Sequence, residues 1–154
     1  MAVCPSCKSE VPAGSRWCAV CHVNALGSSS KLASPGRRFG AYVLDIMIPM
    51  IAFFMMLGLA GVSKSFGVGF LLFVGYGIWA LRLFTQGTTP GKRMLGMRVI
   101  KESGENAHFG TMFLREVIGK AISAMILSLG FIWIFLDRDR QGWHDKIAST
   151  YVVQ

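Results

Sequence analysis

The sequence predicts an α-helical integral membrane protein with a small cysteine-bearing unit at its N-terminus. Of the 154 residues, 53% are hydrophobic and only 16% are charged, and the mean hydropathy is +0.49. This composition is typical of chains solvated by lipid. The apolar residues form long runs, and most charges lie between them. We expect two transmembrane helices, a re-entrant or interfacial helical pair, and a short β pairing on the cytoplasmic side.

The chain divides into three parts by composition. Residues 1–26 hold all four cysteines and are expected to form a compact unit. Residues 27–36 include the serine-rich run GSSSK and read as a flexible linker. Residues 37–154 carry the apolar runs and form the membrane domain. The N-terminus lacks the apolar stretch of a signal peptide, so we expect the first spanning helix to act as its own insertion signal.

Two apolar runs are long enough to cross a bilayer. The first extends from Phe39 to Val62 and is interrupted only by Asp45. The second extends from Phe66 to Phe84, with Arg82 near its end. At 1.5 Å per residue each run spans roughly 30 Å, the thickness of the hydrocarbon core. The short segment between them predicts an antiparallel hairpin with a tight external turn.

Charge placement argues against a third crossing. Reduced cysteines and the basic residues before the first run place the N-terminus in the cytoplasm, which a bacterial-type inner membrane would satisfy. A third span at 111–136 would move Arg138, Arg140 and Lys146 to the opposite side. That segment also begins with charged residues and is divided by Gly130. We therefore expect two shorter helices that re-enter or lie at the interface.

Two strand-like pieces are expected to pair on the cytoplasmic side. One covers Met97 to Ile100 and the other covers Ser149 to Val153. Both are rich in β-branched and aromatic residues. The intervening segment includes a Pro90-Gly91 turn before the first piece and a second turn at 103–106 after it.

Four cysteines in two CxxC pairs predict a metal site. The ligand set is Cys4, Cys7, Cys18 and Cys21. Four thiolates at this spacing can close a tetrahedral zinc site, and so small a unit needs a metal or disulfides to fold. Disulfides are the alternative, disfavoured because no secretory signal exports this end. A structural Zn²⁺ with four protein ligands leaves no open position for catalysis.

The first apolar run carries a polar face. Arg38 and Asp45 lie seven residues apart, about two turns of one helical face. Pro49 lacks an N–H, so the carbonyl of Asp45 loses its helical partner. The carboxylate and this carbonyl together suit a proton or a small cation. Alternatively, Asp45 pairs with a basic side chain, and the candidates are Arg82, Arg115 and Lys120.

Several other functions are disfavoured. The segment GTTPGKR has the wrong glycine spacing for a phosphate-binding loop. His144-Asp145 has no accompanying nucleophile motif, so we expect no enzymatic activity. The net charge of +8 is concentrated beside the apolar runs rather than on a basic patch, which makes nucleic acid an unlikely partner.

Four motifs in order resemble those of the RDD family of membrane proteins. They are RRFGAYVLD at 37–45, TPGKRMLGMRV at 89–99, FLRE at 113–116 and RQGWHDKIASTYVV at 140–153. The resemblance assigns the family's arginine to Arg38 and its two aspartates to Asp45 and Asp145. It implies a bacterial inner-membrane protein, for which transport of unidentified ligands has been suggested. An N-terminal zinc ribbon on such a domain is also familiar, although Lys8 and His22 occupy positions where ribbons usually have glycine.

Two functional hypotheses follow. In the first, the protein is an accessory, assembly or scaffolding component whose charged residues lock the helices and whose zinc ribbon docks other membrane-protein subunits. In the second, it is a small transporter of protons or alkali cations that uses Asp45, with Arg38 and Asp145 at the cytoplasmic entrance. Two spans are few for a pathway, so the second hypothesis requires self-association.

Overall fold

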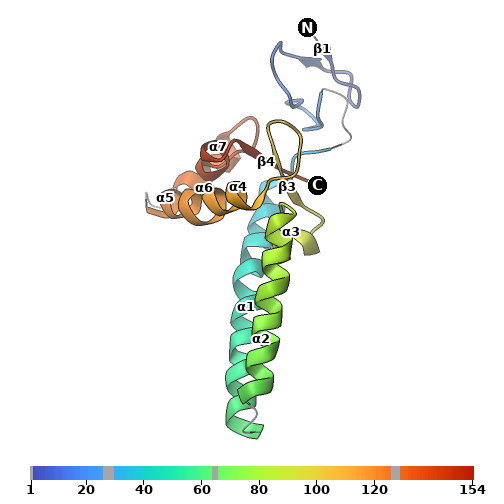
Figure 1. Ribbon diagram of the computed structural model, residues 1–154. Coiled ribbons are helices and arrows are strands. Elements are labelled where there is room, and N and C mark those ends of the chain that lie inside the picture. The colour runs from blue at the N-terminus through green and yellow to red at the C-terminus, as the bar shows by residue number, and fades with distance from the viewer. Residues whose placement is uncertain (1, 26–29, 64–65, 126–128) are drawn as a thin grey trace.

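The computed structural model describes residues 2–25, 30–63, 66–125 and 129–154. Two long helices form an antiparallel hairpin, and a layer of short helices lies across one end of it (Figure 1). The cysteine-bearing unit stands beyond that layer, so the N-terminal unit and the C-terminus share one end of the molecule (Figure 1).

The two long helices are the predicted membrane spans. They are α1 (Pro35–Ser63) and α2 (Phe66–Thr85). Within the described residues these two helices are long and apolar enough to cross a bilayer. Only 6% of the apolar window in α1 and 11% of that in α2 is buried, so most of their side chains are free to face lipid. Helix α1 continues without interruption through Pro49.

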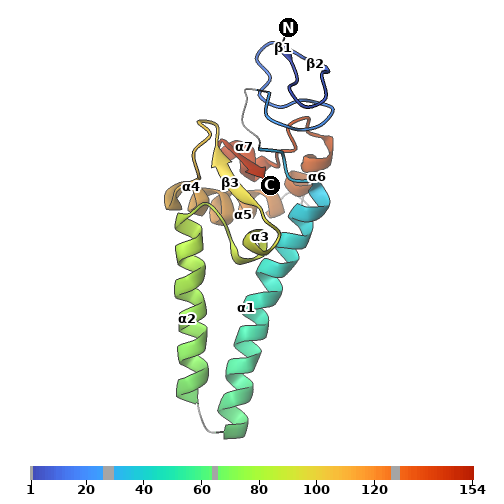
Figure 2. The same ribbon diagram turned by 90° about the vertical axis from the view of Figure 1, so that its right-hand side faces the viewer.

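The two long helices are in close contact near one end of the hairpin and are separated at the other end. Near the connection between the helices, Gly69 of α2 lies so close to α1 that an added Cβ would be 3.0 Å from the Met56 Cα. At the opposite end the helices diverge, and α3 (Pro90–Met94) lies between them (Figure 2). Of Gly67, Gly69, Gly75 and Gly77, only Gly69 makes such an approach.

The expected Pro90-Gly91 turn is in fact the start of a short helix. Thr89 is the N-cap of α3, and its hydroxyl accepts a hydrogen bond from the backbone N–H of Lys92. Pro90 occupies a first-turn position, where its missing N–H costs nothing. The turn prediction was wrong because a helix of five residues is too short to show a hydrophobic period.

The predicted β pairing is confirmed. Strands β3 (Arg98–Lys101) and β4 (Thr150–Val153) are antiparallel, with Val99 opposite Val152. Each strand begins one residue later than expected. The side chains of Val99 and Val152 lie in a buried cluster with Met97, Ala33 and Met112, which fastens the chain end to the start of α1.

The segment after β3 forms the layer across the hairpin. It contains α4 (Phe109–Phe113), a π-helical turn η1 (Leu114–Gly119), α5 (Lys120–Met125), α6 (Leu129–Leu136) and α7 (Trp143–Ile147). These helices lie at a steep angle to α1 and α2 (Figure 1). Within the described residues of 111–136, no helix is a candidate membrane span.

Gly130 does not divide the segment as predicted. It lies inside α6 (Leu129–Leu136), and residues 126–128 lie outside the described part of the chain. A Cβ at Gly130 would be 2.6 Å from the Ser123 side chain. Its missing side chain therefore allows α6 to pack on α5, and the residue is a contact point rather than a boundary.

The N-terminal unit contains two short strands, and the described part of the linker packs on the membrane domain. Its strands β1 (Ala2–Val3) and β2 (Glu10–Val11) are antiparallel. Within the expected linker 27–36, residues 30–36 are described, and Leu32 and Ala33 are fully buried. The N–H of Ala33 donates to the carbonyl of Val152. Helix α1 begins at Pro35, ahead of the expected domain border.

Replacing Gly91 with alanine should separate α3 from α1. A Cβ at this position would lie 2.3 Å from the Ala41 carbonyl oxygen, so we expect a loss of about 1–3 kcal/mol in the free energy of unfolding. Thermal unfolding of the purified protein measures this. The matched control is Gly75→Ala, whose added Cβ meets nothing within 4 Å. Equal stability of the two variants would contradict the contact.

Candidate functional site: a buried charge network and a cysteine cluster

Asp145 is the centre of a buried charge network at the junction of α1, η1 and α7. Its side chain is fully buried. The carboxylate accepts hydrogen bonds from Arg38 Nη1 at 2.6 Å and from Arg115 Nε at 2.5 Å. It also accepts from the backbone N–H of Gly142 at 3.1 Å, which caps the first turn of α7. Three donors from three segments thus converge on one side chain.

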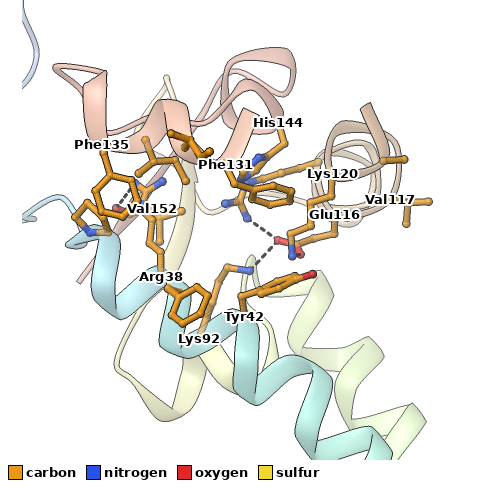
Figure 3. A pocket seen from close by; sticks show the side chains of 16 residues that line it. Arg38, Tyr42, Lys92, Glu116, Val117, Lys120, Phe131, Phe135, His144 and Val152 are labelled. Carbon is orange, nitrogen blue, oxygen red and sulfur yellow. Dashed lines mark hydrogen bonds and ion pairs between the residues drawn. The ribbon is translucent and has the colours of Figure 1, made fainter. Parts of the chain in front are cut away.

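Glu116 is a second centre beside the first. Its Oε1 accepts from Lys92 Nζ at 2.7 Å and from Arg115 Nη1 at 2.6 Å, and Lys120 contacts its Oε2. Arg115 therefore bridges Asp145 and Glu116. Since Lys92 comes from α3, Glu116 also ties that helix to the end layer (Figure 3).

Both carboxylates remain ionised at neutral pH. Burial acts to raise their pKa values, but the positive charges outweigh it. Arg115 and Arg38 hold the pKa of Asp145 well below its ordinary value. Lys92, Arg115 and Lys120 do the same for the pKa of Glu116. Buried ion pairs of this kind specify geometry more than they add stability, but losing one partner is costly.

His144 is the neutral neighbour of this network. Burial lowers its pKa to about 4, and the attraction of Asp145 does not compensate. The imidazole Nε2 lies 3.7 Å from Asp145 Oδ1, and the ring packs on Phe131 with centroids 5.1 Å apart. At pH 7 it is an uncharged packing group rather than a third cation.

Asp45 is held separately, by the N-terminus of α3. Its Oδ2 accepts from the Thr89 hydroxyl at 2.6 Å, and its Oδ1 accepts from the Gly91 N–H at 2.7 Å. A carboxylate is favourable there because the helix dipole and free N–H groups point toward it. No ion pair joins Asp45 to a basic side chain among the described residues, so the expected pairing with Arg82, Arg115 or Lys120 is not observed.

Sequence reasoning placed some of these residues correctly and missed others. The structure brings Arg38 and Asp145 into contact, as the topology predicted. It places Arg115 and Lys120 around Asp145 and Glu116 rather than around Asp45. Glu116, Lys92 and Thr89 were not predicted as site residues. The signal that could have found them is their position within the motifs FLRE and TPGKR.

The four cysteines converge in the N-terminal unit. Their sulfur atoms all lie within 4.8 Å of one another, with Cys4 to Cys21 and Cys7 to Cys18 each at 3.5 Å. Tetrahedral Zn–S bonds of about 2.3 Å separate the sulfurs by about 3.8 Å. None of the four forms a disulfide. The donor set therefore fits Zn²⁺.

The two knuckles have matching backbone geometry. Lys8 and His22 follow the second cysteine of each pair, and both have a φ of +57°. Their N–H groups donate to the carbonyls of Cys4 and Cys18 at 3.0 Å. These are the positions where ribbons usually have glycine, and here both residues adopt the left-handed conformation despite their side chains.

Together these features define a membrane protein with two candidate spanning helices, a buried charge network and a cluster of four cysteines that could hold a metal ion. The chain belongs to the RDD family, whose sequence pattern matches residues 32–149. The match begins at the buried Leu32 and leaves out the cysteine unit.

Two relatives from Bacillus subtilis are similar to the chain. The uncharacterized protein YckC is 30% identical over 122 residues, covering 75% of this chain and 80% of its own length. The uncharacterized protein YxaI is 35% identical over 65 residues, covering 42% of each chain. No solved structure is significantly similar to the chain.

Asp145→Asn should destabilise the protein strongly. The substitution leaves Arg38 buried without its counter-charge and leaves Arg115 with Glu116 alone, which costs about 3–5 kcal/mol. We expect a lower denaturation midpoint and a poor yield from membranes. Glu105→Gln, which removes an exposed carboxylate, is the matched control. An Asp145→Asn protein as stable as this control would exclude the network as a structural centre.

His144→Gln should flatten the acid dependence of stability. The folded protein takes up the His144 proton only near pH 4, whereas the unfolded chain takes it up near pH 6.5. Stability therefore falls as the pH decreases between these values, by about 3 kcal/mol for this group. Unfolding midpoints at pH 7, 5.5 and 4.5 measure the slope. His22 is present in both proteins, so parallel slopes would contradict the assignment to His144.

We expect one zinc ion per chain. Elemental analysis of protein purified without chelator should give this ratio, and Cys18→Ser should reduce it because the remaining three thiolates leave the site open. Ser6→Ala, in the first knuckle, is the control and should retain the metal. Equal zinc content in the cysteine variant and the control would contradict the four-cysteine site.

Proposed function

We propose that this protein is an accessory or assembly component of the membrane, without catalytic activity, whose zinc ribbon docks other subunits. One observation carries the proposal: the cysteine unit is fastened to the same end layer that the charge network holds together. Trp17 packs on Tyr151 with ring centroids 5.3 Å apart. Both belong to a buried cluster with Leu32, Ile100 and Val153. The ribbon is therefore presented on a fixed platform.

The outer surface of the ribbon supports a docking role. A four-thiolate zinc site has no open coordination position, so its metal would stabilise the fold of the unit and would not bind a substrate. Val3 and Val20 are 63% and 68% exposed. Val20 lies within the second knuckle, on a backbone that the metal would hold rigid. Exposed apolar side chains on a small rigid unit are suited to protein contacts.

Charge placement supports a cytoplasmic orientation for this end. Basic residues lie just before α1, in its first turn and in the segment that follows α2; they are Lys31, Arg37, Arg93, Arg98 and Lys101. The positive-inside rule places such residues in the cytoplasm. The reduced cysteines agree with that compartment.

The contacts of Asp45 favour a structural role over cation transport. Both of its oxygens already accept short hydrogen bonds from Thr89 and Gly91. We therefore propose that Asp45 holds α3 on α1.

Asp45→Asn distinguishes the lock from a transporter. As a lock, the variant should lose stability by about 1–3 kcal/mol, because one charge-assisted acceptor is replaced by an amide. Proteoliposomes of the unaltered protein should then show no pH-dependent flux of protons, Na⁺ or K⁺. A flux that Asp45→Asn abolishes while the variant stays folded would instead establish the transporter.

Removal of residues 1–24 tests the docking role. Proteins that co-purify with the full chain from its native membrane should be lost, while the shortened chain remains in the membrane. In the full-length chain, Val20→Glu should weaken the same interactions, and Glu105→Gln should not. Recovery of the same proteins in unchanged yield after the removal would refute docking through the ribbon.

A further inference from the structure

A cavity of about 800 Å³ opens beside the charge network. It lies between the first turns of α1, the η1–α5 segment and α6, and His144 and Val152 also line it (Figure 3). Its volume falls within the range of small-molecule binding sites. It differs from the cysteine cluster in position and chemistry, and the docking role proposed above makes no use of it.

The polar side of the cavity has an excess of positive charge. The basic residues Arg38, Lys92, Arg115 and Lys120 line it, whereas Glu116 is its one lining carboxylate. The buried Asp145 adds a second negative charge. Asp45 of α1, which contacts the N-terminus of α3, adds a third. Positive charge still exceeds negative charge by one. Unbalanced charge at low solvent exposure is costly, so this surface favours an anion.

Arg38 also has unused bonding capacity. Its Nη1 donates to Asp145 and its Nη2 to the Val152 carbonyl. Its Nε is buried and has no hydrogen-bond partner within the described part of the chain. A guanidinium with a free donor is suited to a phosphate oxygen.

The opposite side of the cavity is apolar and continues along the outside of α1. Phe39 is 67% exposed and Phe135 is 70% exposed, and both line the cavity. Tyr42, Ile46 and Met50 follow at intervals of four residues, so they form one exposed stripe on α1. A hydrocarbon chain that left the cavity would lie along this stripe.

The depth of the cavity matches that of lipid headgroups. Arg38 lies in the first turn of the first membrane span, and the helices of the end layer cross the hairpin at this level (Figure 1). Anionic headgroups are attracted to basic residues at the cytoplasmic surface. We propose that the cavity binds the phosphate headgroup of an anionic phospholipid, with an acyl chain along Tyr42, Ile46 and Met50.

Binding to the full-length, zinc-loaded protein in neutral detergent tests the proposal. The probes are dioctanoyl phosphatidylglycerol, dioctanoyl phosphatidylcholine and inorganic phosphate, measured by titration calorimetry. The anionic lipid should bind saturably and at least about tenfold more tightly than the zwitterionic lipid, a difference that one unbalanced charge can supply. Equal binding of the two lipids would overturn the proposal.

Two variants locate the site. Lys120→Gln should weaken binding of the anionic lipid by about fivefold to tenfold, whereas Lys101→Gln on β3 should not. Phe39→Ala should weaken binding of the lipid without changing that of phosphate. Its control is Phe54→Ala, 62% exposed on the same helix. If Lys120→Gln does not fold, the comparison of Phe39→Ala with Phe54→Ala tests whether the lipid binds in this cavity.

Phosphate alone provides the remaining discrimination. If inorganic phosphate binds as tightly as phosphatidylglycerol and Phe39→Ala has no effect, the site takes a soluble phosphate and the lipid assignment is wrong. If neither Lys120→Gln nor Phe39→Ala changes the affinity for phosphatidylglycerol, the lipid binds elsewhere and the proposal fails. The docking role of the zinc ribbon is tested separately, by co-purification of partner proteins, and its outcome does not depend on lipid binding.

Discussion

The carboxylate of Asp145, held between Arg38 and Arg115, is the interaction on which the arrangement of the membrane domain depends. Arg38 belongs to the first span, Arg115 to the π-helical turn and Asp145 to the last helix. Its hydrogen bonds therefore join three elements that are far apart in the sequence. Since the three groups are buried, none can turn to water when a partner is missing. The position of the end layer on the hairpin is therefore fixed by charge as well as by packing.

The carboxylate of Asp45 likewise joins two elements of the fold, α1 and α3. Asp45 of α1 accepts a hydrogen bond from an N–H in the first turn of α3. Asp145, in the first turn of α7, accepts one from the N–H of Gly142, the residue that precedes this helix. Each carboxylate therefore accepts from a free N–H group at the N-terminal end of a five-residue helix. Helices this short are unstable alone and need such contacts. The two aspartates that the family resemblance singles out thus share one physical task in this chain. The arginine that it singles out joins α1 to the second of them.

The sequence was most informative where the physical signal is long or repeated. The two apolar runs, the paired CxxC motifs and the alternating pieces at 97–100 and 149–153 each predicted an element that the structure contains. It was least informative where a contact depends on short backbone features. Helix α3 begins with proline and glycine and reads as a turn, so its N-terminus could not be assigned as the partner of Asp45. Glu116 was not predicted as a site residue, because its partner Lys92 comes from another part of the sequence.

The order of the chain gives the Asp145 contact a further consequence. Arg38 enters the membrane boundary early in synthesis, whereas Asp145 and strand β4 follow more than a hundred residues later. Until that last segment emerges, Arg38 has no counter-charge, Arg115 has only Glu116, and Ala33 has no strand to accept its N–H. The domain therefore cannot complete its fold progressively from the N-terminus, as multidomain chains commonly do. The fold is therefore completed only when the last segment has been made, and a chain cut short before residue 145 would leave Arg38 without its counter-charge.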